Sequence, residues 1–323
     1  MTNLLEFREW LRNCYSRFSL YILAAIRFIT MFVTAVLINQ NIGYMTKLKT
    51  PITALILSMI CAFLPTGVIP LFAAGLIILH LFAASVPLAA IVLGLFVIIL
   101  LVYYRFSPKY AYALLLTPIA LALKVPFLVP LILGVVATPV AMIPVCLGGI
   151  VYFFLQNITQ ASSMLLRVSE EDDVQAYLFI VENTMKSSHM YLTLFAIMLT
   201  ILIVYVIRRL SIDHAWTISV VCGILFDVIV FLIGDFVFDI SVNVAVLLFG
   251  AIVSFIIVFI MQFFVFSVDY SRTEYVQFED DEYYYYVKAV PKLAIAKREK
   301  EVKHINTRQR VKDDKKKIIN NIK

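Results

Sequence analysis

The chain has 323 residues, of which 62% are hydrophobic and 15% are charged, and its mean hydropathy is +0.94. Soluble domains carry about 25% charged residues, so the composition excludes a water-soluble protein and predicts an all-α polytopic membrane protein. The net charge of +6 resides in the C-terminal tail, because residues 288–323 hold 13 Lys and Arg against 4 Asp and Glu.

The first eighteen residues are charged and amphipathic, and we expect a cytoplasmic N-terminal helix over 1–18. A membrane domain over 19–268 follows. Its long apolar stretches lack a period of two, which favours helices over a β-barrel. Six of these stretches are predicted to be clear transmembrane helices: 19–38, 87–104, 142–157, 190–208, 216–234 and 241–267.

Lys and Arg in the short loops predict the orientation, since they gather on the cytoplasmic side. The basic residues used are Arg8, Arg12, Arg17, Arg105, Lys109, Arg208 and Arg209. They place both termini in the cytoplasm of an inner (plasma) membrane of the bacterial type. The segment 158–189 then faces outward, and Lys47 and Lys49 are exceptions to the rule.

Two further regions, 51–84 and 111–141, are apolar but interrupted by Pro and Gly. Their first arms have about 13 residues each, or roughly 20 Å of helix, whereas the hydrocarbon core is about 30 Å thick. Each region is therefore either a re-entrant hairpin or a pair of short spans, which gives six to ten crossings. Their sequences align loosely, so they are either an internal repeat or a chance match. Re-entrant hairpins from opposite faces are typical of transporters.

The stretch "LALKVPFLVP" places Lys124 between the prolines of the second broken region. At the tip of a re-entrant hairpin, this ammonium group would need a partner, water or a substrate anion. In a full span it would instead reach the interface with its long side chain. The first alternative predicts a substrate pathway that includes Lys124, with Thr66 and Gly67 opposite it, and His80.

Two other ionisable residues, Arg27 and Asp227, lie within predicted spans. Unpaired charges are costly in lipid, so we expect an intramembrane charge pair between them, either functional or a buried pair that fixes helix packing. In the outward segment, Ser169 and Asp172 have the spacing of a helix start. An amphipathic helix is expected after them.

After the last span, residues 269–293 predict a cytoplasmic β-hairpin around the turn "EDDE". Its four consecutive tyrosines, Tyr283, Tyr284, Tyr285 and Tyr286, indicate either a docking surface for a partner or an apron on the membrane surface. Residues 294–323 form a basic tail that we expect to be disordered and to bind anionic lipid headgroups. No aromatic pattern supports specific binding of nucleic acid.

The sequence lacks the phosphate-binding loop GxxxxGK[ST] and the motifs HExxH and GxSxG. Its four cysteines form neither CxxC pairs nor Cys/His clusters. We therefore expect no enzyme, cofactor or metal site, and energy from an ion gradient or a separate energy-coupling subunit. The leading hypothesis is a transporter or permease-like protein for a small or lipidic substrate. The alternative is a non-transporting scaffold of a cell-envelope complex that acts through its cytoplasmic tail.

Overall fold

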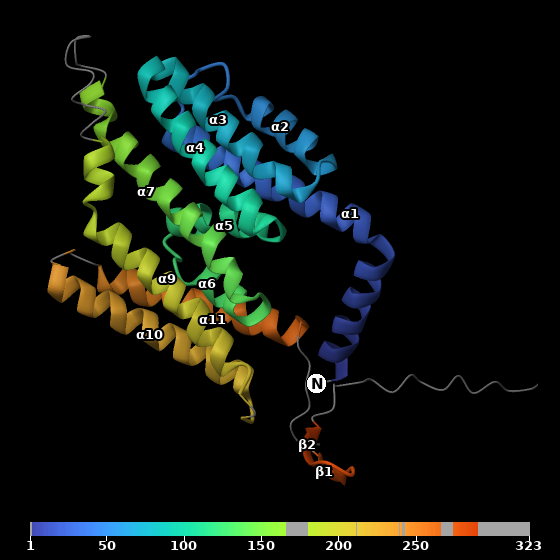
Figure 1. Cartoon of the computed structure of the whole chain (residues 1–323). Helices are drawn as coiled ribbons and strands as arrows, with labels where there is room; N and C mark the ends of the chain where they lie inside the picture. The colour runs from blue at the N-terminus through green and yellow to red at the C-terminus, as the bar shows by residue number, and fades with distance from the viewer. Residues whose placement is uncertain are drawn as a thin grey trace, which may run out of the picture.

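The chain is built mainly of α-helices, followed by one small sheet (Figure 1). The structure is a computed structural model that describes residues 2–165, 180–210, 212–238, 240, 243–265 and 274–289. The α-helices are α1 Thr2–Asn41, α2 Pro51–Phe63, α3 Ile69–Ala84, α4 Val86–Phe106, α5 Ala111–Ala122, α6 Leu128–Val136, α7 Met142–Leu165, α9 Ser188–Ile207, α10 Ala215–Phe238 and α11 Val244–Val265. The short 3-10 helices and the strands are η1 Thr66–Val68, η2 Pro108–Tyr110, η3 Pro139–Ala141, β1 Glu274–Glu279 and β2 Tyr284–Ala289.

Within these ranges, seven helical stretches are long and apolar enough to cross a membrane. They are Glu6–Asn41, Thr66–Ala84, Val86–Phe106, Pro139–Gln160, Ser188–Ile207, Ala215–Phe238 and Val244–Val265. Six of them coincide with the predicted spans, and the seventh, Thr66–Ala84, lies in the first broken region. The length and composition of these helices confirm the predicted class, a multi-pass all-α membrane protein.

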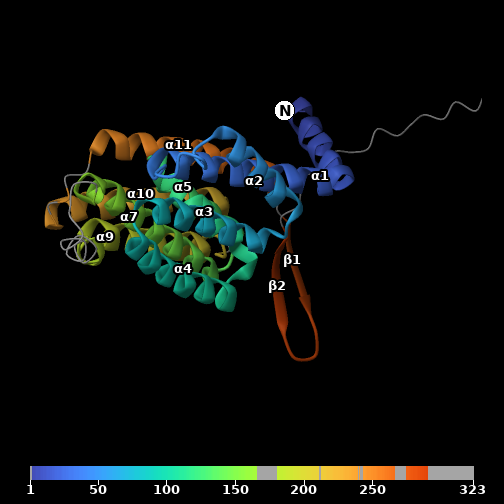
Figure 2. The ribbon, with the colours of Figure 1, turned by 90° about the horizontal axis from the view of Figure 1, so that it is seen from above.

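Helix α1 is broken at Phe18, whose φ of −118° and ψ of 27° are not helical. The part before the break turns in a different direction from the rest of α1 (Figures 1 and 2). Its Phe7 ring meets the Phe264 ring of α11 edge to face, with 6.2 Å between centroids. The beginning of α1 therefore lies beside the end of α11, and the end of α1 lies toward the beginning of α11.

Polar caps and prolines mark where several helices begin. The Thr50 hydroxyl accepts the Thr53 amide at 3.4 Å, and Pro51 follows as the first residue of α2. The Ser187 hydroxyl accepts the Met190 amide at 3.2 Å at the start of α9. Each cap satisfies an amide that has no partner within its own helix, and a proline at the first position has no amide to satisfy.

Buried side chains form two main clusters. The first contains residues of all helices from α1 through α5 and of α7, among them Met31, Leu81 and Phe154. The second joins α6 with α9, α10 and α11, and includes Leu131 and Val204. The α5–α6 hairpin therefore contributes one arm to each cluster and lies at the boundary between them (Figure 1).

Close helix packing at this boundary depends on small residues, as is common in membranes. A Cβ atom at Gly148 of α7 would lie 2.7 Å from the Leu114 carbonyl oxygen of α5. A Cβ at Gly223 of α10 would lie 2.6 Å from a methyl group of Val204 and 2.9 Å from one of Leu131. Larger side chains at these positions would push α5 and α6 away from their supports.

The two broken regions differ in architecture. In the first, η1 and α3 form the continuous stretch Thr66–Ala84, which is long enough to cross a membrane, although α2 is shorter. In the second, α5 has 12 residues and α6 has 9, so both arms are short. Only the second region is built entirely from half-length helices, and the loose sequence alignment between the regions does not correspond to a matching pair of folds.

The outward segment is described only at its ends, since residues 166–179, which include Ser169 and Asp172, lie outside the described residues. Residues 180–185 are helical, and the Asn157 amide donates to the Thr184 hydroxyl at 2.8 Å. This bond ties the last part of the segment to α7. The tail 294–323 also lies outside the described residues.

Strands β1 and β2 pair antiparallel, with Phe278 opposite Tyr285 and Val276 opposite Val287. The turn is closed by Asp280, whose carboxylate accepts the amides of Glu282 and Tyr283 at 2.9 and 2.6 Å. The hairpin projects away from the helices as a separate arm (Figure 2). The small two-stranded sheet expected after the last span is therefore present.

Candidate functional site

Lys124 lies in the turn that joins α5 to α6, with a left-handed φ of 62°. The Lys124 amide donates to the Leu121 carbonyl at 3.1 Å, and the Val125 amide donates to the Ala120 carbonyl at 2.9 Å. These two bonds form a Schellman motif, in which glycine is the favoured residue at the left-handed position. A lysine there costs roughly 1 kcal/mol or more of stability relative to glycine. An unfavourable residue at such a position is a reason to ask what its side chain does.

The two ends of the hairpin are tied together at its base. The Tyr110 and Thr138 hydroxyl groups are hydrogen bonded at 2.9 Å, and the Thr138 amide donates to the Tyr110 hydroxyl at 3.3 Å. The Arg208 guanidinium, from the end of α9, donates to the carbonyl oxygens of Val135 and Ala137. A cation suits the carbonyl end of α6 because the helix dipole is negative there.

This geometry makes 111–136 a hairpin of two short helices. At 1.5 Å per residue its arms are roughly 18 and 14 Å long, well short of a hydrocarbon core of about 30 Å, and its two ends lie side by side. At the tip, the Lys124 carbonyl oxygen would be 2.7 Å from a Cβ at Gly250 of α11. Gly250 lies six residues after the start of α11, or about 9 Å along its axis, so the tip nearly reaches the opposite end of the bundle.

A cavity of about 490 Å³ lies beside this hairpin, with Lys124 in its lining. Helices α1, α3, α4, α5 and α7 supply the other lining residues. The volume is in the range of sites that hold one small-molecule ligand. A second cavity of about 390 Å³, between α1, α2 and α3, is lined almost wholly by apolar residues and has no charged side chain.

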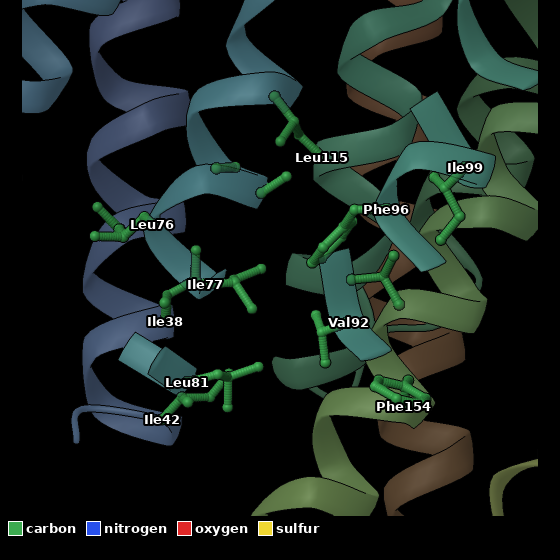
Figure 3. Close-up of a cluster of buried hydrophobic side chains, with 14 of the residues drawn as sticks. Ile38, Ile42, Leu76, Ile77, Leu81, Val92, Phe96, Ile99, Leu115 and Phe154 are labelled. Atoms are coloured by element: carbon green, nitrogen blue, oxygen red, sulfur yellow. The ribbon is translucent and has the colours of Figure 1, made fainter. Parts of the chain in front are cut away.

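The larger cavity has an apolar floor. Six of the floor residues are labelled in Figure 3 as part of the first buried cluster: Ile38, Ile42, Ile77, Phe96, Ile99 and Leu115. They are all buried. A ligand group placed on this floor would lose contact with water, which favours an apolar group.

The lining also includes a polar rim, defined here as Gln40, Asn41, Gln156, Thr159 and Gln160. Four of these five residues are exposed, and Gln156 is half-buried. The rim lies at the end of α1 and late in α7, the same end of the bundle that the hairpin tip approaches. The lining therefore combines a set of buried apolar side chains with a set of amide and hydroxyl side chains that are mostly exposed.

Lys124 is the one charged residue in the lining of this cavity. It is exposed, and within the described ranges its side chain forms no hydrogen bond or salt bridge. Among the described residues, the lining includes no Asp or Glu. The charge of this described part of the lining therefore favours an anion.

Thr66 and Gly67 do not lie opposite Lys124, and they do not line the cavity. Their turn lies at the end of α4, where the Tyr104 hydroxyl donates to the Gly67 carbonyl at 2.9 Å. The physical reason is the length of the helical stretch Thr66–Ala84, which carries this turn to the end of the bundle rather than to its middle. The structure therefore does not bring Thr66 and Gly67 to the cavity that Lys124 lines.

His80 is fully buried, and it too lies outside the cavity lining. Its Nε2 lies 2.8 Å from the Asn39 side-chain oxygen, and the Met45 amide donates to its Nδ1 at 3.3 Å. With Nδ1 as an acceptor, Nε2 carries the proton and donates to Asn39. Both ring nitrogens are thus satisfied, and the histidine joins α3 to the end of α1.

The structure does not bring Arg27 and Asp227 together: no salt bridge joins them in the described part of the chain. Helix α1 packs mainly on α2 and α3, whereas α10 packs on α9 and α11. Asp227 is 1% exposed, and its Oδ1 accepts the Thr200 hydroxyl at 2.5 Å. Its Oδ2 is buried and has no hydrogen-bond partner among the described residues.

The tyrosines of the β-hairpin divide between its two faces. Tyr285 shares one face with Phe278, on which its ring stacks at 4.8 Å between centroids, while Tyr284 and Tyr286 lie on the other face. Tyr283 belongs to the turn. All four tyrosines are exposed, and so are Val276, Phe278 and Val287, which leaves one largely apolar face uncovered.

The predictions from sequence did not include the rim of the cavity. They used Arg208 only to orient the chain in the membrane, and not as a hydrogen-bond donor to the end of α6. The rim has a sequence signal, because two apolar helices end in amide-rich stretches, "INQN" at 38–41 and "LQNITQ" at 155–160. Nothing local indicates that these stretches, more than 110 residues apart, meet around the same cavity as Lys124. The pairing of Arg208 with α6 is equally non-local.

Comparisons of this chain with protein-family models, with curated proteins and with solved structures find no match. No family, relative or structural neighbour therefore supports one function over another. The argument for function rests on the cavity, the hairpin that carries Lys124 and the exposed sheet.

Proposed function

We propose that this chain is a transporter or permease-like membrane protein, and that its substrate occupies the cavity between α1, α3, α4, α5 and α7. The observation that supports the proposal is the hairpin 111–136, which places Lys124, unpaired within the described residues, in the lining of a largely apolar cavity. Discontinuous helices beside a central site are a recurring plan of transporters.

The hairpin also suits a conformational role. Its arm α5 contributes to the first cluster and α6 to the second, and a movement of this hairpin would displace Lys124 and the α5 residues that line the cavity. Alternating access works by such movement of one bundle against another. By the distribution of Lys and Arg, the rim opens on the outer face in the described arrangement.

Alternating access can be tested with single cysteines in a variant whose native cysteines are replaced by serine. Leu115→Cys on the floor is expected to react with a membrane-impermeant thiol reagent from either face, in right-side-out and in inverted vesicles. Gln156→Cys on the rim is expected to react from one face. Leu88→Cys is the control, because Leu88 is as buried as the floor but does not line the cavity. Reaction of position 115 from one face alone would indicate a dead-end pocket and contradict transport.

The exposed apolar face of the β-hairpin favours a second function, that of a membrane scaffold for a cell-envelope complex. A lone hairpin is marginal in water, and Val276, Phe278, Tyr285 and Val287 are uncovered. The two functions are separable by complementation of a strain that lacks this gene. If the protein is a transporter, the Lys124→Leu variant should fail to complement this strain, and the variant that lacks 273–323 should complement it at least in part. A scaffold requires the reverse.

A further inference from the structure

The composition of the cavity narrows the class of molecule that it fits. Within the part of the chain that the structure describes, its lining has an apolar floor, an amide-rich rim, one ammonium group and no carboxylate. A wholly polar solute would lose hydrogen bonds to water on the apolar floor without gaining new ones there. A wholly apolar molecule would leave the ammonium without an anion.

We propose that the ligand is a single-chain amphiphile with an anionic, phosphate-type headgroup. Its chain would lie on the floor formed by α1, α3, α4 and α5, and its headgroup would meet Lys124 and the rim. The inference rests on the proposed function, since it names the substrate class of the same cavity. The volume of about 490 Å³ suits one ligand of drug-like size, which is the reason for one chain rather than two.

The rim chemistry matches such a headgroup. An ammonium binds a phosphate as a point charge, and side-chain amides and hydroxyls donate hydrogen bonds to anion oxygens. The half-buried Gln156 and the exposed Gln40 present amides beside the cavity. The Asn41 amide is less available, because it donates to the Leu37 carbonyl at 2.8 Å.

The backbone at Lys124 supports the same assignment. Its left-handed φ of 62° is a position where glycine removes steric strain, so stability alone favours glycine. A lysine at this position is explained if its ammonium binds a ligand. The only other non-glycine residue with positive φ in the described ranges is His214, with φ 58°, in the connection between α9 and α10.

The test measures binding to the purified full-length protein in neutral detergent. Three probes are compared: lysophosphatidylglycerol, the monoacylglycerol with the same acyl chain, and glycerol phosphate. We expect the first to bind at least tenfold more tightly than either of the others, because a hydrogen bond to a charged group and burial of the chain both contribute. Equal binding of the anionic and neutral amphiphiles, or of lysophosphatidylglycerol and glycerol phosphate, would overturn the proposal.

Variants assign the binding to this cavity. Lys124→Gln and Lys124→Gly should weaken lysophosphatidylglycerol at least tenfold, whereas Lys124→Arg should largely retain it. Lys109→Gln is the matched control, because Lys109 is an exposed lysine at the base of the same hairpin and does not line the cavity. Lys124→Gly also relieves backbone strain, so loss of binding in this variant cannot be attributed to unfolding. Unchanged binding in both Lys124 variants would contradict the assignment.

Filling the floor provides an independent check on the acyl chain. Ala73 lines the cavity and is buried, so Ala73→Leu should weaken lysophosphatidylglycerol and leave glycerol phosphate unchanged. Equal effects on the two probes would overturn the placement of the chain. Flux of lysophosphatidylglycerol in proteoliposomes is measured separately. Binding without flux would remove the transport function but keep the ligand class, and flux of another solute without this binding would do the opposite.

Discussion

Lys124 combines an unfavourable backbone conformation with an unpaired charge. Both ends of the Schellman motif are well formed, with bonds of 3.1 and 2.9 Å, so the left-handed φ is imposed by the turn itself. The side chain gains no compensating hydrogen bond or salt bridge within the described ranges. At the scale of a residue, the stability of the free protein alone would favour glycine at this position.

Lys124→Gly should therefore make the protein more stable by about 1 kcal/mol, because glycine adopts positive φ without a Cβ penalty. Thermal unfolding in detergent, followed by circular dichroism, measures the effect as a higher melting temperature. His214→Gly is the matched control, since it relieves a similar φ of 58° away from the cavity. Both variants should be stabilised, and only Lys124→Gly should lose ligand binding. A destabilised Lys124→Gly would show that the side chain has a structural role.

Asp280 makes the turn of the β-hairpin sensitive to pH. The Glu282 amide, with the Tyr285 hydroxyl and the Tyr283 amide, holds the pKa of Asp280 below its ordinary value. The bond to Asp280 raises the pKa of Tyr285. A lowered carboxyl pKa contributes stability above the unfolded value of about 3.9, and a raised phenol pKa contributes stability below about 10.

The turn should consequently be most stable between about pH 4 and pH 10. Below this window protonation of Asp280 should loosen it, and above the window ionisation of Tyr285 should do the same. The Tyr285 and Phe278 ring signals in NMR spectra of selectively labelled protein measure the change. Asp280→Asn should abolish the acidic transition, and an acidic transition that persists in this variant would contradict the assignment.

At the scale of elements, the hairpin 111–136 depends on three supports: Gly250 at its tip, Arg208 at the end of α6, and the Tyr110–Thr138 pair at its base. Gly250 is the most specific of these. A Cβ atom there would lie 2.7 Å from the Lys124 carbonyl oxygen, and a backbone oxygen in a hydrogen-bonded turn has little freedom to move away.

Gly250→Ala should destabilise the protein by about 1–3 kcal/mol, the usual cost of overpacking. The control is Gly94→Ala in α4, where nothing lies within 4 Å of the added Cβ. That change should instead stabilise by roughly 0.5–1 kcal/mol through helix propensity. Thermal unfolding of the two variants in the same detergent gives the comparison, and equal effects would show that the tip does not press on α11.

Much of this element structure is predictable from sequence, and the exceptions have physical reasons. Long apolar stretches predict the spans, and the short arms of 111–141 predict either a re-entrant hairpin or a pair of short spans. The first broken region is different because Pro70 falls in the first turn of α3, where a proline begins a helix rather than interrupting it. Lys124 stands out as a charge in an apolar stretch, whereas the rim amides and Arg208 acquire their meaning only from helices that are distant in the sequence.

At the scale of the whole molecule, two buried clusters meet at one broken hairpin. The arms α5 and α6 contribute to different large clusters and share a smaller one with α9, and the cavity lies on the α5 side. The beginning of α1 rests on the end of α11 through Phe7 and Phe264, so the two halves also meet at the N-terminal helix. A protein assembled in this way can change the cavity by a small relative movement of its halves.

The central claim is that 111–136 folds back, so its two flanks lie on one face of the membrane. Single cysteines at Lys109 and Val140, both exposed, test it with a membrane-impermeant thiol reagent in intact cells and inverted vesicles. A cysteine at Lys47, in the loop after α1, serves as the reference for the opposite face. The account predicts that positions 109 and 140 react from the same face and position 47 from the other. Reaction of positions 109 and 140 from opposite faces would show that the segment crosses the membrane an odd number of times instead of folding back, and would contradict the account.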